Sequence, residues 1–142
     1  MTQLTYQTTL NPPAEVTGPI ERGLHDFNLS VLGPEVIYDY AKIAITARDG
    51  EQIAGGVIGE LIWGWLHIQT LWVAAEQRGN DIGTRLLAEI EQAARARGVC
   101  QATLETTSFQ ARDFYLKNGF EVVGAVEGKP RGHTWYYMKK AF

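Results

Sequence analysis

The chain has 142 residues, of which 45% are hydrophobic and 20% charged. This length and composition exclude a disordered or fibrous chain and predict a single domain over residues 1–142. The net charge of −3 argues against a nucleic-acid partner, which would require a basic surface. The single cysteine, Cys100, excludes an internal disulfide, and no apolar run reaches the length of a membrane span. We therefore expect a cytoplasmic protein without a membrane partner, with Cys100 buried as a small core residue.

The first half of the sequence predicts a strand, a helix and three closely spaced strands. Residues 4–9 favour β structure and are followed by Asn11-Pro12-Pro13, which ends it. Apolar residues recur at helical spacing from 14 to 32, and since Gly18-Pro19 interrupts them, we expect the helix to begin at Pro19. Strands follow over 41–47, 53–62 and 65–73, joined by tight turns at 48–51 and 63–64. The last two are apolar at both parities, so we expect both of their faces to be covered.

The second half predicts a long helix followed by shorter elements. Residues 81–97 carry one apolar stripe, with Glu91 on the outer face, and Gly98 ends the helix. A strand is expected over 99–106, a short helix over 109–118, and strands over 121–126 and 134–138. The order β-α-β-β-β-α-β-α-β-β predicts a mixed α/β (α+β) fold whose sheet is largely antiparallel and flanked by helices.

The residues from Leu71 to Thr84 pass from a predicted strand through a polar turn into the best predicted helix. A helix N-terminus presents unpaired N–H groups and a partial positive charge. Glycines at 79 and 83 let the backbone approach an anion, and Arg78 adds donors. This predicts either a phosphate-binding turn or a plain connection capped by Asn80 or Asp81. The spacing does not match the glycine loops that bind nucleotides in P-loop and dinucleotide-binding proteins.

The segment Arg78-Gly79-Asn80-Asp81-Ile82-Gly83 resembles the coenzyme A pyrophosphate loop of the GNAT superfamily of N-acetyltransferases, Gln/Arg-x-x-Gly-x-Gly/Ala. Residues 108–120, SFQARDFYLKNGF, are similar to that family's helix with the pattern Ala-x-x-x-Tyr-x-x-x-Gly-Phe. The two motifs lie the expected distance apart, and the order of elements matches the family, so the resemblance covers essentially the whole chain. It implies acetyl-CoA as co-substrate, no metal, and a V-shaped split between strands 65–73 and 99–106 that binds it.

The resemblance also implies cofactor-binding residues. The backbone of Leu71, Trp72 and Val73 would pair with the pantetheine arm, and the amides from Arg78 to Thr84 would hold the pyrophosphate. The implied positions are Leu71, Trp72, Val73, Arg78, Gly79, Asn80, Asp81, Ile82, Gly83, Thr84, Ser108, Ala111 and Phe114. Asp81 replaces the family's usual middle glycine, and Ser108 replaces a frequent asparagine. Because aspartate tolerates positive φ, we expect the loop to form and coenzyme A binding to survive, although the Asp81 carboxylate would repel a pyrophosphate unless it turned away to cap the helix.

The implied reaction is direct attack of a primary amine on the thioester. Tyr115 would protonate the departing thiolate as general acid, although it is also suited to simple core packing. His67 is the first candidate base, because histidine titrates near neutrality and this one lies four residues before Leu71 with the same strand parity. Glu60 and Glu105 are further candidates, and each of the three is also an ordinary polar strand residue. A backbone N–H near Val73 would stabilise the oxyanion.

Two other functions stay open on the sequence. Asp81 is compatible with a noncatalytic acyl-CoA-binding regulatory domain, and the polar turn is compatible with a phosphate-binding protein unrelated to acyl transfer. The resemblance implies a small-molecule or peptide amine as acceptor, which the chain does not identify further. Glu60, Glu105 and Glu127 favour a cationic one. The family often forms homodimers, so the resemblance also admits one here.

Overall fold

The computed structural model describes residues 3–142, apart from the side chains of Ile37 and Tyr38. It separates into two compact units, one ending at Tyr38 and one running from Asp39 to Phe142. The first unit holds α1 (Ala14–Leu32) and α2 (Pro34–Tyr38).

Helix α1 begins at Ala14, so the predicted start at Pro19 is wrong. The carbonyl of Pro13 accepts hydrogen bonds from the N–H groups of Val16 and Thr17, at 2.9 and 3.2 Å, which closes the first turn before Pro19 is reached. A proline so near the helix start removes one backbone hydrogen bond without ending the helix. Helix α2, which the sequence did not predict, starts with Pro34, a residue favoured at the first helical position.

The strand predicted over residues 4–9 is also wrong, because this segment has no regular secondary structure. A short strand is stable only when it hydrogen-bonds to a neighbour. In the described part of the chain, all strand pairing occurs among six strands of the second unit. The β-favouring composition of residues 4–9 therefore has no sheet to join.

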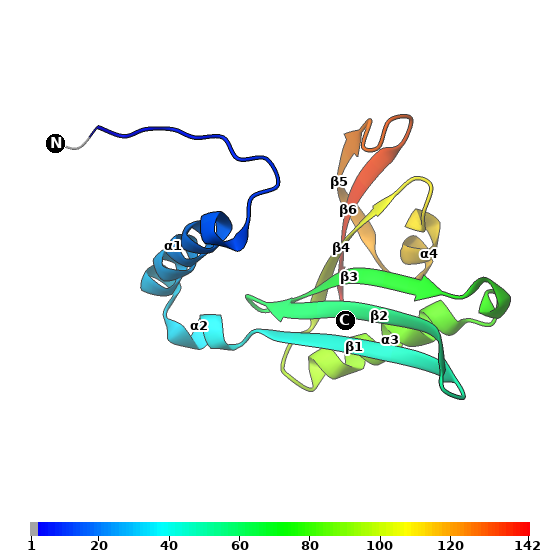
Figure 1. Cartoon of the computed structure of the whole chain (residues 1–142). Helices are drawn as coiled ribbons and strands as arrows, with labels where there is room; N and C mark the ends of the chain where they lie inside the picture. Colours follow the sequence, from blue (N-terminus) through cyan, green and yellow to red (C-terminus); the bar gives the residue numbers. More distant parts are fainter. Residues whose placement is uncertain (1–2) are drawn as a thin grey trace. The chain divides into compact units, whose positions relative to one another are not determined.

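The second unit is built on a six-stranded sheet in the order β1-β2-β3-β4-β6-β5. The strands are β1 (Ala41–Asp49), β2 (Gln52–Ile62), β3 (Trp65–Val73), β4 (Gln101–Thr107), β5 (Glu121–Glu127) and β6 (Thr134–Ala141). Neighbours are antiparallel except β3 and β4, which confirms the predicted mixed, largely antiparallel sheet. Figure 1 shows β4, β6 and β5 turning away from the direction of β1 to β3.

The helices of the second unit lie in the connections that flank β4. The short 3-10 helix η1 (Ala75–Gln77) and α3 (Ile82–Arg95) follow β3, and α4 (Arg112–Lys117) follows β4. The predicted left-handed glycine after the long helix is confirmed, since Gly98 has φ +79°. The predicted turn at 63–64 is confirmed as well, with φ of +52° at Trp63 and +82° at Gly64.

Helix α3 packs its apolar stripe against one face of the sheet. Leu86, Leu87, Ile90 and Ala94 join the core with strand residues such as Val57 and Leu66. The opposite face is more open, because Ile58 is 38% exposed while its neighbour Val57 is fully buried. The expectation that both faces of β2 are covered is therefore wrong: apolar β-branched residues also suit a partly exposed strand face.

Two polar residues also differ from expectation. Cys100 is exposed, whereas its neighbour Val99 is 4% exposed and fills the core position at the start of β4. Glu91, expected on the outer face of α3, is 6% exposed and forms an ion pair with Lys140 of β6. Within residues 3–142, no helix is long and apolar enough to cross a membrane.

Candidate active site

Strands β3 and β4 separate partway along their length. They pair in parallel at Leu66–Ala102, His67–Thr103 and Ile68–Leu104. Beyond this segment β3 continues to Val73 and β4 to Thr107. The later part of β3 therefore presents an edge inside the sheet, as the sequence predicted for a split strand pair (Figure 1).

A β-bulge in β3 lies at the point of separation. Ile58 of β2 pairs with Thr70, but the next residue, Gly59, pairs with Ile68, so Gln69 is an additional residue in β3. Side chains alternate between the two faces of a strand, and one additional residue reverses the alternation. The expectation that His67 and Leu71 share a parity is therefore wrong, because the bulge places them on opposite faces.

The register between β2 and β3 shows which face of the sheet His67 and Leu71 each occupy. Leu71 lies opposite the buried Val57, on the face covered by α3, whereas His67 lies opposite Glu60 on the other face. The split in the sheet lies between these two environments.

The backbone of Leu71 and Val73 is directed toward this gap. The N–H of Ala74 donates to the carbonyl of Ala54 at 2.8 Å, which fixes the hydrogen-bonding phase between β2 and β3. In an antiparallel ladder, every second residue turns its N–H and C=O away from the partner strand. In this register, Val73 and Leu71 are the residues whose N–H and C=O point away from β2. Arg78 Nε donates to the carbonyl of Val73 at 3.2 Å, so the turn after β3 is tied to that edge.

A groove of about 580 Å³ lies beside the edge of β3, at the N-terminus of α3 and along α4. It contains ten of the predicted cofactor-binding residues: Leu71, Val73, Arg78, Gly79, Asp81, Ile82, Gly83, Thr84, Ala111 and Phe114. The structure also brings in Gln77, Lys117 and Asn118, which sequence reasoning missed. The spacing could have identified two of them, because residues three and four positions after Phe114 share its helix face.

The other three predicted cofactor residues lie outside this lining. Trp72 is 50% exposed, and strand alternation turns its side chain away from the face of Leu71 and Val73. Asn80 donates to the carbonyl of Gln77 at 3.3 Å and lines a neighbouring hollow with Arg48. Ser108 Oγ accepts from the N–H of Thr134 at 3.0 Å and lies 3.1 Å from His133 Nδ1, so it links β6 to the segment before α4.

Asp81 occupies the N-cap position of α3 in the left-handed conformation, with φ 59° and ψ 20°. The prediction that aspartate could adopt this conformation is confirmed. The prediction that its carboxylate caps the helix is wrong, since it makes no capping hydrogen bond within the described structure. A cap side chain reaches the first turn from an extended backbone, which a left-handed residue does not have. Asp81 lines the groove together with Arg78 and Lys117, so the groove contains both signs of charge.

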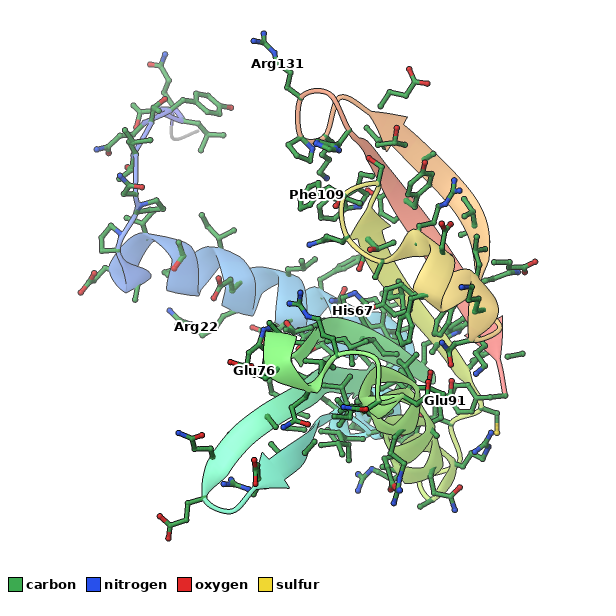
Figure 2. The ribbon with its side chains drawn as sticks, turned by 90° about the vertical axis from the view of Figure 1, so that its right-hand side faces the viewer. Arg22, His67, Glu76, Glu91, Phe109 and Arg131 are labelled. Atoms are coloured by element: carbon green, nitrogen blue, oxygen red, sulfur yellow. The ribbon has the colours of Figure 1, made fainter. Side chains whose placement is uncertain are left out.

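The three candidate bases converge on the opposite face. His67 Nε2 lies 2.8 Å from Oε2 of Glu105, and His67 Nδ1 lies 3.7 Å from Oε1 of Glu60. Figure 2 shows His67 near the middle of the sheet. Tyr40, which sequence reasoning missed, donates from its hydroxyl to Oε2 of Glu60 at 3.0 Å. This hydrogen bond, followed by burial and the charge of Glu60, raises the pKa of Tyr40.

These polar side chains come from three neighbouring strands and the residue before β1, so only the sheet register could have revealed their convergence. The partly buried side chains of Glu60, His67 and Glu105 are 20%, 29% and 32% exposed. They are accessible to a ligand yet shielded enough for charge interactions to matter. Across residues 3–142, no group of three or more His, Cys, Asp or Glu side chains has an arrangement that could hold a metal ion.

Tyr115 lies on α4 and is 7% exposed. Its ring packs against Phe114 and Phe120, with centroids 5.3 and 5.7 Å apart. Burial disfavours the phenolate and raises the pKa of Tyr115 to about 12, so the hydroxyl keeps its proton at neutral pH. The residue contributes to the core and, chemically, remains a proton donor.

Comparison with known proteins agrees with this geometry. A family model described as the acetyltransferase (GNAT) family matches residues 15–120. The chain is 38% identical over 102 residues to a blasticidin-S acetyltransferase of Streptomyces morookaense, a match spanning 71% of this chain and 74% of that protein. A crystal structure of an acetyltransferase from Bacillus cereus has a TM-score of 0.87 and 32% identity, covering 96% of this chain and 98% of that one.

A more distant crystal structure contains the donor. It is designated a streptothricin acetyltransferase from Bacillus anthracis and is in complex with acetyl coenzyme A. Its TM-score is 0.64 and its identity 26%, over 71% of this chain and 62% of that one. Together with the split strands and the groove at the start of α3, these matches show that the chain belongs to the GNAT family of acetyltransferases and is an acyltransferase.

Proposed function

We propose that this acetyltransferase transfers the acetyl group of acetyl-CoA directly to a primary amine of a small molecule or peptide. The observation that carries the proposal is the open edge of β3 after Ile68, which adjoins a groove at the N-terminus of α3. An edge whose N–H and C=O groups point away from β2, with only the Val73 carbonyl contacted by Arg78, suits the amide-containing pantetheine arm, and a helix N-terminus suits a pyrophosphate.

The donor would lie along the α3 face. The backbone of Leu71 and Val73 would pair with pantetheine, and the amides from Arg78 to Thr84 would surround the pyrophosphate, with charge from Arg78 and Lys117. Trp72 and Asn80 would contribute their backbone only, and Ser108 would order the segment before α4. The streptothricin acetyltransferase that contains acetyl-CoA supports this choice of donor.

The reaction would proceed in one displacement. His67, assisted by Glu60, accepts a proton from the amine, and the nitrogen then attacks the thioester carbon. A backbone N–H near Val73 stabilises the oxyanion. When the carbon–sulfur bond breaks, Tyr115 gives its proton to the thiolate and regains one from solvent. The amide product and free coenzyme A leave, and no covalent enzyme intermediate forms.

The acceptor would be a small cationic amine. Glu60 and Glu105 lie on the face where the acceptor would meet the thioester, and each favours a positive partner. The relative named blasticidin-S acetyltransferase supports a small molecule over a macromolecule. The exposed, unpaired Cys100 is consistent with a reducing cytosol as the location.

Thermal unfolding with acetyl-CoA, with ATP as control, tests the donor. A ligand at 100 times its Kd stabilises the folded state by about 2.7 kcal/mol, which raises Tm by several degrees at this size. Thiol release with a panel of primary amines then tests transfer. Acetyl-CoA binding without turnover of any amine would favour the noncatalytic acyl-CoA-binding domain, and the lack of a shift with acetyl-CoA would exclude both functions.

A further inference from the structure

Tyr40, Glu60, His67 and Glu105 form an ordered chain of polar contacts across the sheet. The Tyr40 hydroxyl donates to Oε2 of Glu60 at 3.0 Å. The other oxygen of Glu60 lies 3.7 Å from His67 Nδ1, and His67 Nε2 lies 2.8 Å from Glu105. The two sides of the imidazole are therefore unequal: Nε2 is within hydrogen-bonding distance of its carboxylate, and Nδ1 is too far from the other.

This asymmetry determines the tautomer of neutral His67. An ionised carboxylate only accepts hydrogen bonds, so at 2.8 Å the proton must lie on Nε2. Nδ1 then carries the lone pair and is the basic nitrogen. Consequently two acceptors, the Nδ1 lone pair and Oε1 of Glu60, face one another across 3.7 Å. A group with several N–H donors and a positive charge would satisfy both.

We propose that Nδ1 of His67 and Oε1 of Glu60 together bind the acceptor as its ammonium ion, with Glu105 and Tyr40 as positioning residues. The inference rests on the proposed function and specifies the form in which the acceptor is recognised. One ammonium N–H bonds to Glu60 and another to Nδ1. The ammonium ion gives one proton to Nδ1, the N–H electron pair stays on nitrogen, and the neutral amine then attacks the thioester carbon. The second proton leaves the nitrogen for solvent as the carbon–sulfur bond breaks, and the His67 imidazolium returns its proton to solvent after the product has left.

The positioning residues act through these two groups. Glu105 keeps the proton on Nε2 and stabilises the imidazolium that forms, while Tyr40 occupies Oε2 of Glu60 and directs Oε1 toward the histidine. The neighbouring charged and titratable groups lie at adjoining register positions. Lys42 of β1 lies opposite Glu60, Tyr137 of β6 lies opposite Glu105, and Lys139 of β6 lies 3.7 Å from Glu121.

The first test measures binding without turnover. The protein is labelled with ¹⁵N-histidine, and the His67 signals are assigned with His67→Gln. Phenethylamine, an ammonium ion at neutral pH, is compared with aniline, which is uncharged there. We expect an Nε2-protonated His67 whose Nδ1 signal shifts with phenethylamine. In Glu60→Gln the Kd for phenethylamine should rise about 10- to 100-fold while that for aniline changes little, because a hydrogen bond to a charged group is lost.

The second test separates positioning from folding. Glu105→Gln offers Nε2 a donor, so the Nδ1-protonated tautomer should appear in the spectrum. Tyr40→Phe should raise the KM for phenethylamine severalfold and leave the KM for acetyl-CoA unchanged. Glu51→Gln makes the same charge change as Glu60→Gln at an exposed site in the turn between β1 and β2 and should behave as the wild type.

Three results would overturn the inference. They are a wild-type His67 protonated on Nδ1, an Nδ1 signal that does not shift with phenethylamine, and a Glu60→Gln variant in which the Kd rises equally for both amines. A failure of the proposed function is recognised separately. In that case acetyl-CoA produces no thermal shift, although phenethylamine still moves the His67 signal.

Discussion

Gly83 lies against the ring of Phe114: a Cβ built on Gly83 would lie 3.0 Å from Cζ of Phe114. This close approach joins the first turn of α3 to α4 at one wall of the groove. Packing therefore requires a glycine at position 83 in addition to any contact with a phosphate, because a side chain there would displace the ring of Phe114.

Gly83→Ala should weaken acetyl-CoA binding with little change in stability. Overpacking at Phe114 costs about 1 kcal/mol or more, and the better helix propensity of alanine offsets roughly 1 kcal/mol of that cost. The displaced ring narrows the groove, so the Kd for acetyl-CoA should rise. Calorimetric titration measures it. Gly23→Ala in α1, where no described atom lies within 4 Å of the new Cβ, is the matched control. Unchanged binding in Gly83→Ala would show that the ring moves without narrowing the site.

The sequence predicted the groove well because its information is local. The turn from Arg78 to Gly83 and the helix face bearing Ala111 and Phe114 are each set by neighbouring residues and their spacing. Such patterns specify a helix start and a left-handed turn without knowledge of the rest of the fold. Most of the positions that the family resemblance implied for the cofactor therefore line this one groove.

The acceptor side depends on pairing between strands, which one sequence does not reveal. Gln69 has no signature of a bulge, yet its insertion opposite β2 reverses the parity between His67 and Leu71. Tyr40 precedes β1 and contacts Glu60 only because the register of β1 and β2 brings them together. Glu91 likewise has the spacing of a surface residue of α3, and only the fold shows that it forms an ion pair with Lys140 of β6.

Asp81→Asn should bind acetyl-CoA more tightly than the wild type. Asparagine also tolerates the left-handed conformation recorded at Asp81, where φ is 59°, so the turn is kept while a negative charge leaves the groove. Removing about 1 kcal/mol of repulsion near the surface would lower the Kd roughly fivefold at low salt.

The salt dependence distinguishes this cause from a change in loop structure. The gain in Asp81→Asn should shrink at high ionic strength, because exposed charges are screened. Asp81→Ala removes the same charge, but alanine tolerates the left-handed conformation less well than aspartate or asparagine, so this variant should lose about 1–2 kcal/mol of stability. Equal affinity of wild type and Asp81→Asn at low salt would show that the carboxylate does not repel the ligand.

Tyr115→Phe should lower kcat by about 10²- to 10⁴-fold, the range of a lost general acid, without changing the Kd for acetyl-CoA. Phenylalanine keeps the ring contacts with Phe114 and Phe120, so the core should remain packed. Thiol release under saturating acetyl-CoA and amine measures the effect. A fully active variant would show that Tyr115 serves only in packing, and that water or another group protonates the thiolate.

Lys140→Met should destabilise the protein by about 3–5 kcal/mol, because it leaves the Glu91 carboxylate buried without a partner. The side chains of Lys140 and Glu91 are 19% and 7% exposed and lie 2.6 Å apart, linking β6 to α3. Glu91→Leu combined with Lys140→Met should recover most of the loss. Glu89→Ala breaks the exposed pair with Arg85, whose side chain is 79% exposed, and should cost under about 0.5 kcal/mol. Denaturant unfolding measures all three.

Tyr115 should also make stability fall between pH 10 and pH 12. Its pKa is about 10 in the unfolded chain and about 12 in the fold, so the folded state favours the protonated phenol. That contribution is complete below pH 10 and is lost as pH rises through 12, about 2–3 kcal/mol in all.

Tyr115→Phe cannot ionise there, so its unfolding free energy should decline less over this range. Tyr6→Phe, at a side chain 91% exposed, should follow the wild-type curve. Parallel curves for wild type and Tyr115→Phe would mean that the buried hydroxyl is hydrated enough to ionise at the ordinary pH of a tyrosine, and that burial does not raise its pKa.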